Sequence, residues 1–87
     1  MSYIPERYES MYNLTFENEK ILKKAKKCVC VNCKNRFNIS RVETWIGDES
    51  ALTAMCPFCL VDSVMPAVIE DKVISDEDLN NLKKIYF

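Results

Sequence analysis

The chain has 87 residues, of which 48% are hydrophobic and 29% charged, with a formal net charge of −1, five cysteines and no histidine. This composition predicts a single globular domain over 1–87, and no run approaches the roughly 18–20 apolar residues of a membrane span. With no histidine and one glycine, the chain lacks the usual general base and a glycine-rich phosphate loop, so we expect no enzyme activity.

The first third of the chain predicts an arm and a helix. Residues 1–14 are rich in tyrosine but follow no clear period, and we interpret them as an N-terminal arm that either lies on the body of the protein or is loose. Thr15 then precedes acidic residues and a run of helix formers whose lysines gather at the end, where the helix dipole favours cations. This pattern predicts a helix over 15–27 with Thr15 as its N-cap.

A strand and a short middle helix are expected next. Residues 28–31 alternate between cysteine and valine, like a short strand that leads into the first cysteine pair. Ser40 and Glu43 have the spacing of a capping box, and Gly47 is of the type preferred just after a helix. The sequence therefore predicts a short helix over 42–46 that ends at this glycine.

The last part of the chain predicts a hairpin and a helix. Residues 51–55 are expected to be a strand that pairs with residues 60–65, and Pro66 ends this hairpin. After a linker, Ser75 precedes three acids and caps a C-terminal helix within 67–87. One face of that helix carries apolar side chains at helical spacing, namely Leu79, Leu82 and Tyr86.

Four of the five cysteines form two Cys-x-x-Cys pairs, Cys30/Cys33 and Cys56/Cys59. Two residues between thiolates allow a tight turn that points both sulfurs at one ion, and two such turns complete a tetrahedral zinc site. Such a site is closed and structural, and it would supply stability that a core of this size lacks. We predict one Zn²⁺ per chain, with iron less favoured.

Two alternatives concern the thiols. Cys28 stands outside both pairs, and we expect a small buried hydrophobic residue there, with a reactive thiol as the alternative. Cys56-Pro57-Phe58-Cys59 also resembles the redox dithiol of glutaredoxins, but that interpretation leaves Cys30 and Cys33 unexplained. The N-terminal residues do not resemble a secretory signal, so we expect a cytoplasmic protein in which paired cysteines bind metal.

Charge is divided sharply along the chain. Residues 20–41 contain eight lysines and arginines and no acid, whereas residues 42–78 contain nine acids and one lysine. The two segments either neutralise each other when they pack or leave oppositely charged surfaces that orient a partner.

Around the cysteine pairs the sequence resembles the zinc-ribbon superfamily, in particular a group of small bacterial cytoplasmic proteins of unassigned function. The resemblance covers 28–87, and its features are Phe37, Trp45, Thr53-Ala54-Met55-Cys56-Pro57-Phe58-Cys59, Asp62-Ser63-Val64-Met65-Pro66 and Tyr86-Phe87. It implies a small α+β fold with a zinc ribbon over 28–66 and a four-cysteine site on two knuckles, but no activity. Leu60 departs from the glycine that usually follows the last cysteine.

These features together predict a zinc-stabilised module that binds another protein. The nine aromatic residues are of the kind that anchor interfaces, and the divided charge would orient a partner. One particular form is an immunity protein or antitoxin that binds a toxin. The alternative is a nucleic-acid-binding zinc ribbon that uses the basic stretch 20–41. The sequence identifies neither the partner nor the oligomeric state.

Overall fold

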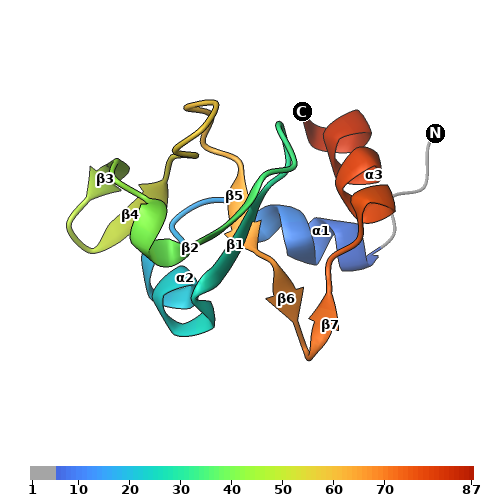
Figure 1. Cartoon of the computed structure of the whole chain (residues 1–87), viewed down its shortest axis with the longest axis horizontal. Coiled ribbons are helices and arrows are strands. Elements are labelled where there is room, and N and C mark those ends of the chain that lie inside the picture. Colours follow the sequence, from blue (N-terminus) through green and yellow to red (C-terminus); the bar gives the residue numbers. More distant parts are fainter. Residues whose placement is uncertain (1–5) are drawn as a thin grey trace.

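The computed structural model describes residues 6–87, which form a small α+β fold (Figure 1). Its helices are α1 (Glu6–Asn13), α2 (Glu19–Ala25) and α3 (Asp76–Tyr86), and a 3₁₀ turn spans Ile39–Arg41. Its strands are β1 (Lys27–Cys30), β2 (Arg36–Asn38), β3 (Trp45–Asp48), β4 (Ala51–Ala54), β5 (Val64–Pro66), β6 (Val68–Ile69) and β7 (Lys72–Val73).

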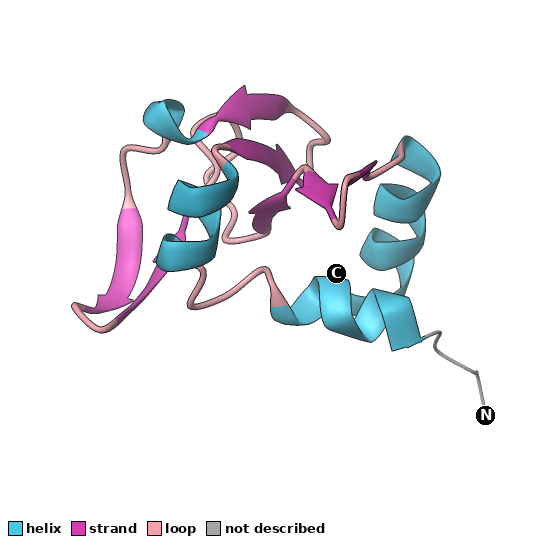
Figure 2. Cartoon of the chain, turned by 90° about the horizontal axis from the view of Figure 1, so that it is seen from below, coloured by secondary structure: helices cyan, strands magenta, loops and turns pink. Residues whose placement is uncertain are grey.

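The strands form three antiparallel units. β1 is the centre of a three-stranded sheet with the order β2-β1-β5, and β3-β4 and β6-β7 are separate two-stranded ribbons. Figure 2 views the molecule from below and shows helices on both sides of the strands. Among residues 6–87, no helix combines the length and apolar character needed to cross a membrane.

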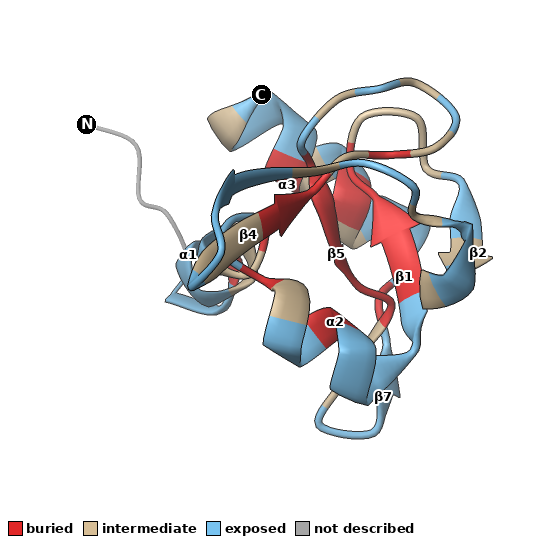
Figure 3. Cartoon of the chain, turned by 90° about the vertical axis from the view of Figure 1, so that its left-hand side faces the viewer, coloured by how far each residue is buried: buried red, intermediate tan, exposed pale blue. Residues whose placement is uncertain are grey.

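Strand β1 separates two hydrophobic cores, because successive side chains of a strand point to opposite faces. We call the first the cysteine core, and its buried residues are Leu22, Cys28, Cys30, Ala54, Cys56 and Val64. We call the second the helical core, and its buried residues are Tyr8, Val29, Val31, Met65, Ala67, Ile74, Leu79 and Leu82. Figure 3 shows β1 and β5 as the buried centre of the molecule.

Helix α3 confirms the prediction made for the C-terminal segment. The Ser75 hydroxyl accepts a hydrogen bond from the Asp78 backbone N–H at 3.1 Å, as an N-cap does. Leu79 and Leu82 are fully buried in the helical core. The helix therefore begins after the residue predicted to cap it, and the face predicted to be apolar is the one that is buried.

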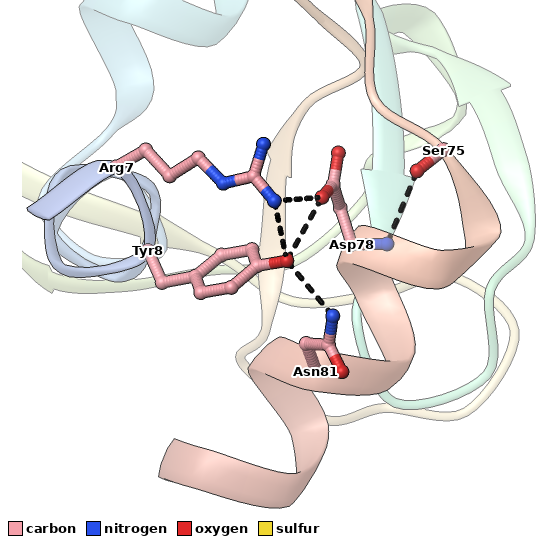
Figure 4. A network of polar contacts seen from close by, with 5 residues as sticks. All are labelled: Arg7, Tyr8, Ser75, Asp78 and Asn81. Carbon is pink, nitrogen blue, oxygen red and sulfur yellow. Dashed lines mark hydrogen bonds and ion pairs between the residues drawn. The ribbon is translucent and has the colours of Figure 1, made fainter. Parts of the chain in front are cut away.

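Within the N-terminal arm predicted over 1–14, residues 6–13 form α1, a helix that the sequence did not predict; residues 1–5 lie outside the described part. Tyr8 is buried and ties α1 to α3 (Figure 4). Its hydroxyl donates to Asp78 Oδ1 at 3.1 Å and accepts from Asn81 Nδ2 at 2.8 Å and from Arg7 at 2.9 Å. Tertiary contacts with α3 therefore support a helix that has no clear amphipathic period of its own.

The helix predicted over 15–27 is shorter than expected, because α2 begins at Glu19. Asn18 is fully buried, and its side chain donates to the backbone carbonyls of Leu14 and Val64, each at 2.8 Å. Its side-chain oxygen accepts from the Ala54 N–H at 3.2 Å. These three bonds hold residues 14–18 as a loop against β4 and β5 and delay the start of the helix.

The middle helix predicted over 42–46 is wrong. The side chain of Asn38 accepts from the Ser40 N–H, which supports only a 3₁₀ turn, and Trp45–Asp48 then forms β3. Gly47 lies within this strand at a φ of 114°, where a Cβ would be 2.6 Å from the Ala51 carbonyl oxygen. The glycine therefore permits close approach of β4 and does not end a helix.

The pairing predicted for the second half is also wrong, although the strand expected over 51–55 is present as β4. β4 pairs with β3, and β5 pairs with β1 instead of closing a hairpin with β4. The expected linker contains the β6-β7 hairpin, whose tip residues Glu70 and Asp71 have φ angles of 50° and 64°. Two non-glycine residues with positive φ give no sequence signal for such a turn.

Candidate metal centre

The first cysteine pair forms a tight turn at the end of β1. The Cys30 N–H donates to the Asn35 carbonyl at 3.0 Å, and the Lys34 N–H donates to the Cys30 carbonyl at 2.8 Å. Lys34 closes the turn in the left-handed region, with a φ of 63°. This geometry directs the sulfurs of Cys30 and Cys33 to the same side.

The second pair repeats the same turn in a distant part of the sequence. The Cys56 N–H donates to the Val61 carbonyl at 3.0 Å, and the Leu60 N–H donates to the Cys56 carbonyl at 3.0 Å. Leu60 has a φ of 61°, the conformation for which glycine is usually chosen. The two Cys-x-x-Cys turns, which we call knuckles, therefore have the same backbone conformation, and both lie at the top of Figure 1.

The two knuckles bring the four predicted ligands together. All four Sγ atoms lie within 4.8 Å of one another, with Cys30 and Cys59 at 3.6 Å and Cys33 and Cys56 at 3.6 Å. Zn–S bonds of about 2.3 Å in a tetrahedron would separate the sulfurs by about 3.8 Å. The arrangement therefore fits a four-coordinate metal ion.

Each sulfur of the cluster also has a polar neighbour that can donate a hydrogen bond. The contacts are Ser63 Oγ to Cys30 at 3.2 Å, Asn35 Nδ2 to Cys33 at 3.3 Å, Phe58 N–H to Cys56 at 3.4 Å and Asn32 Nδ2 to Cys59 at 3.5 Å. Such donors stabilise thiolates and orient them as ligands. The surroundings therefore suit four negatively charged sulfurs.

The thiols differ in their acidity. Burial raises the pKa of Cys30 to about 12, and burial also raises the pKa of Cys56. Burial acts in the same direction on Cys59, but hydrogen bonds from Asn32 and the Val61 N–H, together with those to the Cys30 and Cys56 thiols, outweigh it and lower the pKa to about 7. A bound cation would have to displace the protons of the buried thiols.

The sequence interpretation missed the side chains that surround the sulfurs. Asn32 is next to Cys33 and Asn35 lies two residues after it, so their donor amides were an available signal. Ser63 comes from beyond the second knuckle, is fully buried and also accepts a bond from the Asn32 N–H at 3.4 Å. Only the pairing of β5 with β1 brings Ser63 to this place, and no local pattern reports that pairing.

Cys28 is fully buried and lies outside the four-sulfur cluster, as expected for a small hydrophobic residue. Burial raises the pKa of its thiol to about 11. A protonated, enclosed thiol is a poor nucleophile, so these properties disfavour the reactive-thiol alternative.

Little of the basic segment is neutralised by ion pairs. Within the part of the chain that the structure describes, Arg36–Asp76 at 3.4 Å is the one ion pair between residues 20–41 and 42–78. Lys23 pairs with Glu19 on its own helix at 2.9 Å. The other six cations of the segment have no ion pair among the described residues, which favours a positively charged surface.

Comparisons of the chain with protein-family models, with curated proteins and with solved structures found no match. The resemblance to the zinc-ribbon superfamily therefore stays a prediction. The structure itself shows a small α+β fold and a cluster of four cysteines that is compatible with a metal site.

Proposed function

We propose that this protein is a non-enzymatic module that binds one Zn²⁺ for stability and binds another protein as its function. The observation that carries the proposal is the closed cluster of four sulfurs, each with a polar neighbour. An immunity protein or antitoxin that binds a toxin is the particular form we favour, in a cytoplasmic setting.

The donor set supports zinc. Four cysteine thiolates in a tetrahedron are one of the common structural sites for Zn²⁺, where the ion contributes folding free energy and no chemistry. Cys30, Cys33, Cys56 and Cys59 would hold it and thereby join the end of β1 to the loop before β5. Four protein ligands would leave no position for a substrate or water, which supports a role without catalysis.

An aromatic cluster between α1 and α3 supports binding of a protein. The rings of Tyr12 and Tyr86 are stacked with centroids 4.0 Å apart, and Phe16 and Phe87 contact Tyr12 edge-on. Phe16 is 44% exposed and Phe87 is 45% exposed. Exposed aromatic side chains that are already ordered by their neighbours are effective anchors at interfaces, because little side-chain entropy is lost on binding.

A second candidate function is nucleic-acid binding through the basic stretch 20–41. Between Lys20 and Lys34 the sequence has no aromatic residue, but the fold brings two aromatic rings from outside the stretch close to its cations. Lys23 lies over the ring of Trp45 at 5.7 Å, and Arg41 lies over the ring of Phe58 at 5.5 Å. Cations beside aromatic rings are a feature of single-strand binding surfaces.

A capture experiment distinguishes the two functions. The zinc-loaded protein would be immobilised and exposed to lysate of the source cell, with and without nuclease. We expect a protein that is retained after nuclease treatment and whose retention falls in Phe16→Ser, while Lys23, Lys24, Lys26 and Lys27 changed together to glutamine reduce it only partly. Capture of nucleic acid alone, abolished by the lysine changes, would contradict the proposal and support the second candidate.

A further inference from the structure

Two apolar grooves border the short strand β6. The first has a volume of about 470 Å³ and runs between α2 and β6, with Leu14, Ile21, Pro66 and Ile69 in its lining. The second has a volume of about 400 Å³ and lies between the β1-β2 hairpin and the β6-β7 hairpin. Val68 lines both grooves, so they are neighbours. In Figure 1, α2 and the β6-β7 hairpin lie at the lower side with β1 between them.

Each groove leaves one large aliphatic side chain exposed. Ile21 in the first groove is 43% exposed, and Val73 in the second is 70% exposed. Burial of aliphatic surface releases free energy in proportion to the area removed from water. The grooves can therefore gain from an apolar occupant.

The charged side chains that line the two grooves are all cations. They are Lys24 in the first groove and Lys27 and Arg36 in the second, and no carboxylate of residues 6–87 lines either groove. Arg36 also contacts Asp76 at 3.4 Å, whereas Lys24 and Lys27 form no ion pair among the described residues. The neighbouring cavity beside α1 differs, because its lining mixes Arg7 and Lys72 with Glu70 and Asp78.

We propose that these two grooves bind a segment of the partner protein in which apolar side chains are flanked by aspartate or glutamate. The inference rests on the proposed function and adds to the aromatic anchors a second place of contact and its chemistry. Apolar side chains of the segment cover Ile21 and Val73, and its carboxylates face Lys24 and Lys27. A nucleic acid would satisfy the cations but leave the aliphatic surface exposed.

The direct test uses three short fluorescent peptides. The first contains leucines flanked by aspartate and glutamate, the second replaces the acids with lysine, and the third replaces the leucines with serine. We expect the zinc-loaded protein to bind the first peptide about tenfold or more tightly than either control, as anisotropy would measure. Similar affinities for all three peptides would overturn the proposal.

Matched variants locate the binding. Ile21→Ser should weaken binding of the acidic peptide about tenfold, and Lys24→Gln with Lys27→Gln about three- to tenfold. The controls are Ile85→Ser and Lys84→Gln on α3, since Ile85 is also exposed, at 38%. Both controls should bind like the wild type; an equal loss in the controls, or no loss in Ile21→Ser, would overturn the assignment.

The test separates this inference from the proposed function. If the Ile21→Ser variant captures a partner protein as well as the wild type does, the grooves are not the binding site, but the proposal that the chain binds a protein stands. Self-association that Ile21→Ser abolishes would assign the grooves to a second copy and refute an acidic segment. Loss of all protein capture after nuclease treatment would refute the proposed function itself.

Discussion

The two cores that share β1 differ in what fills them. The helical core consists of aliphatic side chains and Tyr8, contributed by α1, α3 and four strands or their ends. The cysteine core has Leu22 and Val64 as its larger buried residues, and the rest are three cysteines and an alanine. Four further apolar side chains pack against the cysteine core but are only partly buried, namely Phe37, Ile39, Val42 and Trp45. Among the buried residues, therefore, only the first core consists mainly of large apolar side chains.

This difference indicates that the two cores depend on different sources of stability. Large apolar side chains give free energy through burial alone, at about 25 cal/mol per Å². Buried thiols of small volume give less, and their donors suit charged sulfurs. We therefore expect the cysteine core to require its metal and the helical core to persist for longer without it.

Loss of one ligand should have the largest effect. Cys59→Ser should abolish stoichiometric zinc and lower the free energy of unfolding by more than about 5 kcal/mol, because structural zinc contributes about 10–16 kcal/mol in apparent terms. Elemental analysis and thermal unfolding would measure both. Hydrogen exchange should report earlier loss of protection in β1 and β5 than in α3.

Cys28→Ser is the matched control, because Cys28 lies in the same core but outside the sulfur cluster. It should retain one zinc per chain. Equal metal loss in both variants would place Cys28 among the ligands, and an iron-rich, red preparation would refute zinc.

A cavity in the other core should have the next largest effect. Leu82→Ala should cost about 2–5 kcal/mol, since Leu82 is fully buried, and should leave the zinc content unchanged. Denaturant unfolding of the zinc-loaded protein measures the cost, with exposed Ile85→Ala as the control. Release of zinc at native conditions by Leu82→Ala would show that the two cores are not separable.

The buried thiol of Cys28 predicts a smaller, pH-dependent effect. Its pKa is raised from 9.0 to about 11, so the native state keeps a proton that the unfolded chain loses. The associated stability is fully present below pH 9 and is lost as the pH rises to 11, by at most about 3 kcal/mol. The free energies of unfolding of the wild type and of Cys28→Ala should converge as the pH rises from 9 to 11. A difference between them that stays constant over this range would contradict the prediction.

The smallest expected effect is a gain. Leu60 has a positive φ and a side chain that is 65% exposed, so Leu60→Gly removes strain and little buried surface. We expect stabilisation of about 1 kcal/mol or less, because the relief of about 1–2 kcal/mol is offset by the greater freedom of unfolded glycine. Lys34→Gly, at the matching position of the other knuckle, should act in the same direction. Clear destabilisation by both substitutions would contradict the prediction that the positive φ angles of Leu60 and Lys34 strain the backbone.

Local patterns predicted the parts of the fold that local forces determine. The cap at Ser75 and the apolar face of α3 were readable, as were the alternation of β1 and the spacing of the four cysteines. The cysteine spacing was informative because each knuckle is a short-range turn. The cluster was therefore predicted in full, whereas its hydrogen-bond donors were not.

The remaining errors arise where contacts between residues far apart in the sequence determine the secondary structure. Helix α1 depends on Tyr8 meeting Asp78 and Asn81, which lie far away in the sequence. Gly47 has the same sequence signal in a helix end and in a close strand pair, and only the presence of β4 beside it selects the strand. No pattern within a few residues of either position carries that information.

The shared strand β1 also limits how the length of this chain can vary. Cys28 and Cys30 face one core, and Val29 and Val31 face the other. Deletion of Val29 would reverse the parity of the strand before Cys30 and turn the Cys28 side chain towards the helical core. Insertions and deletions of one residue within β1 should therefore not be tolerated, which makes the length of this strand a constraint beside the identity of the ligands.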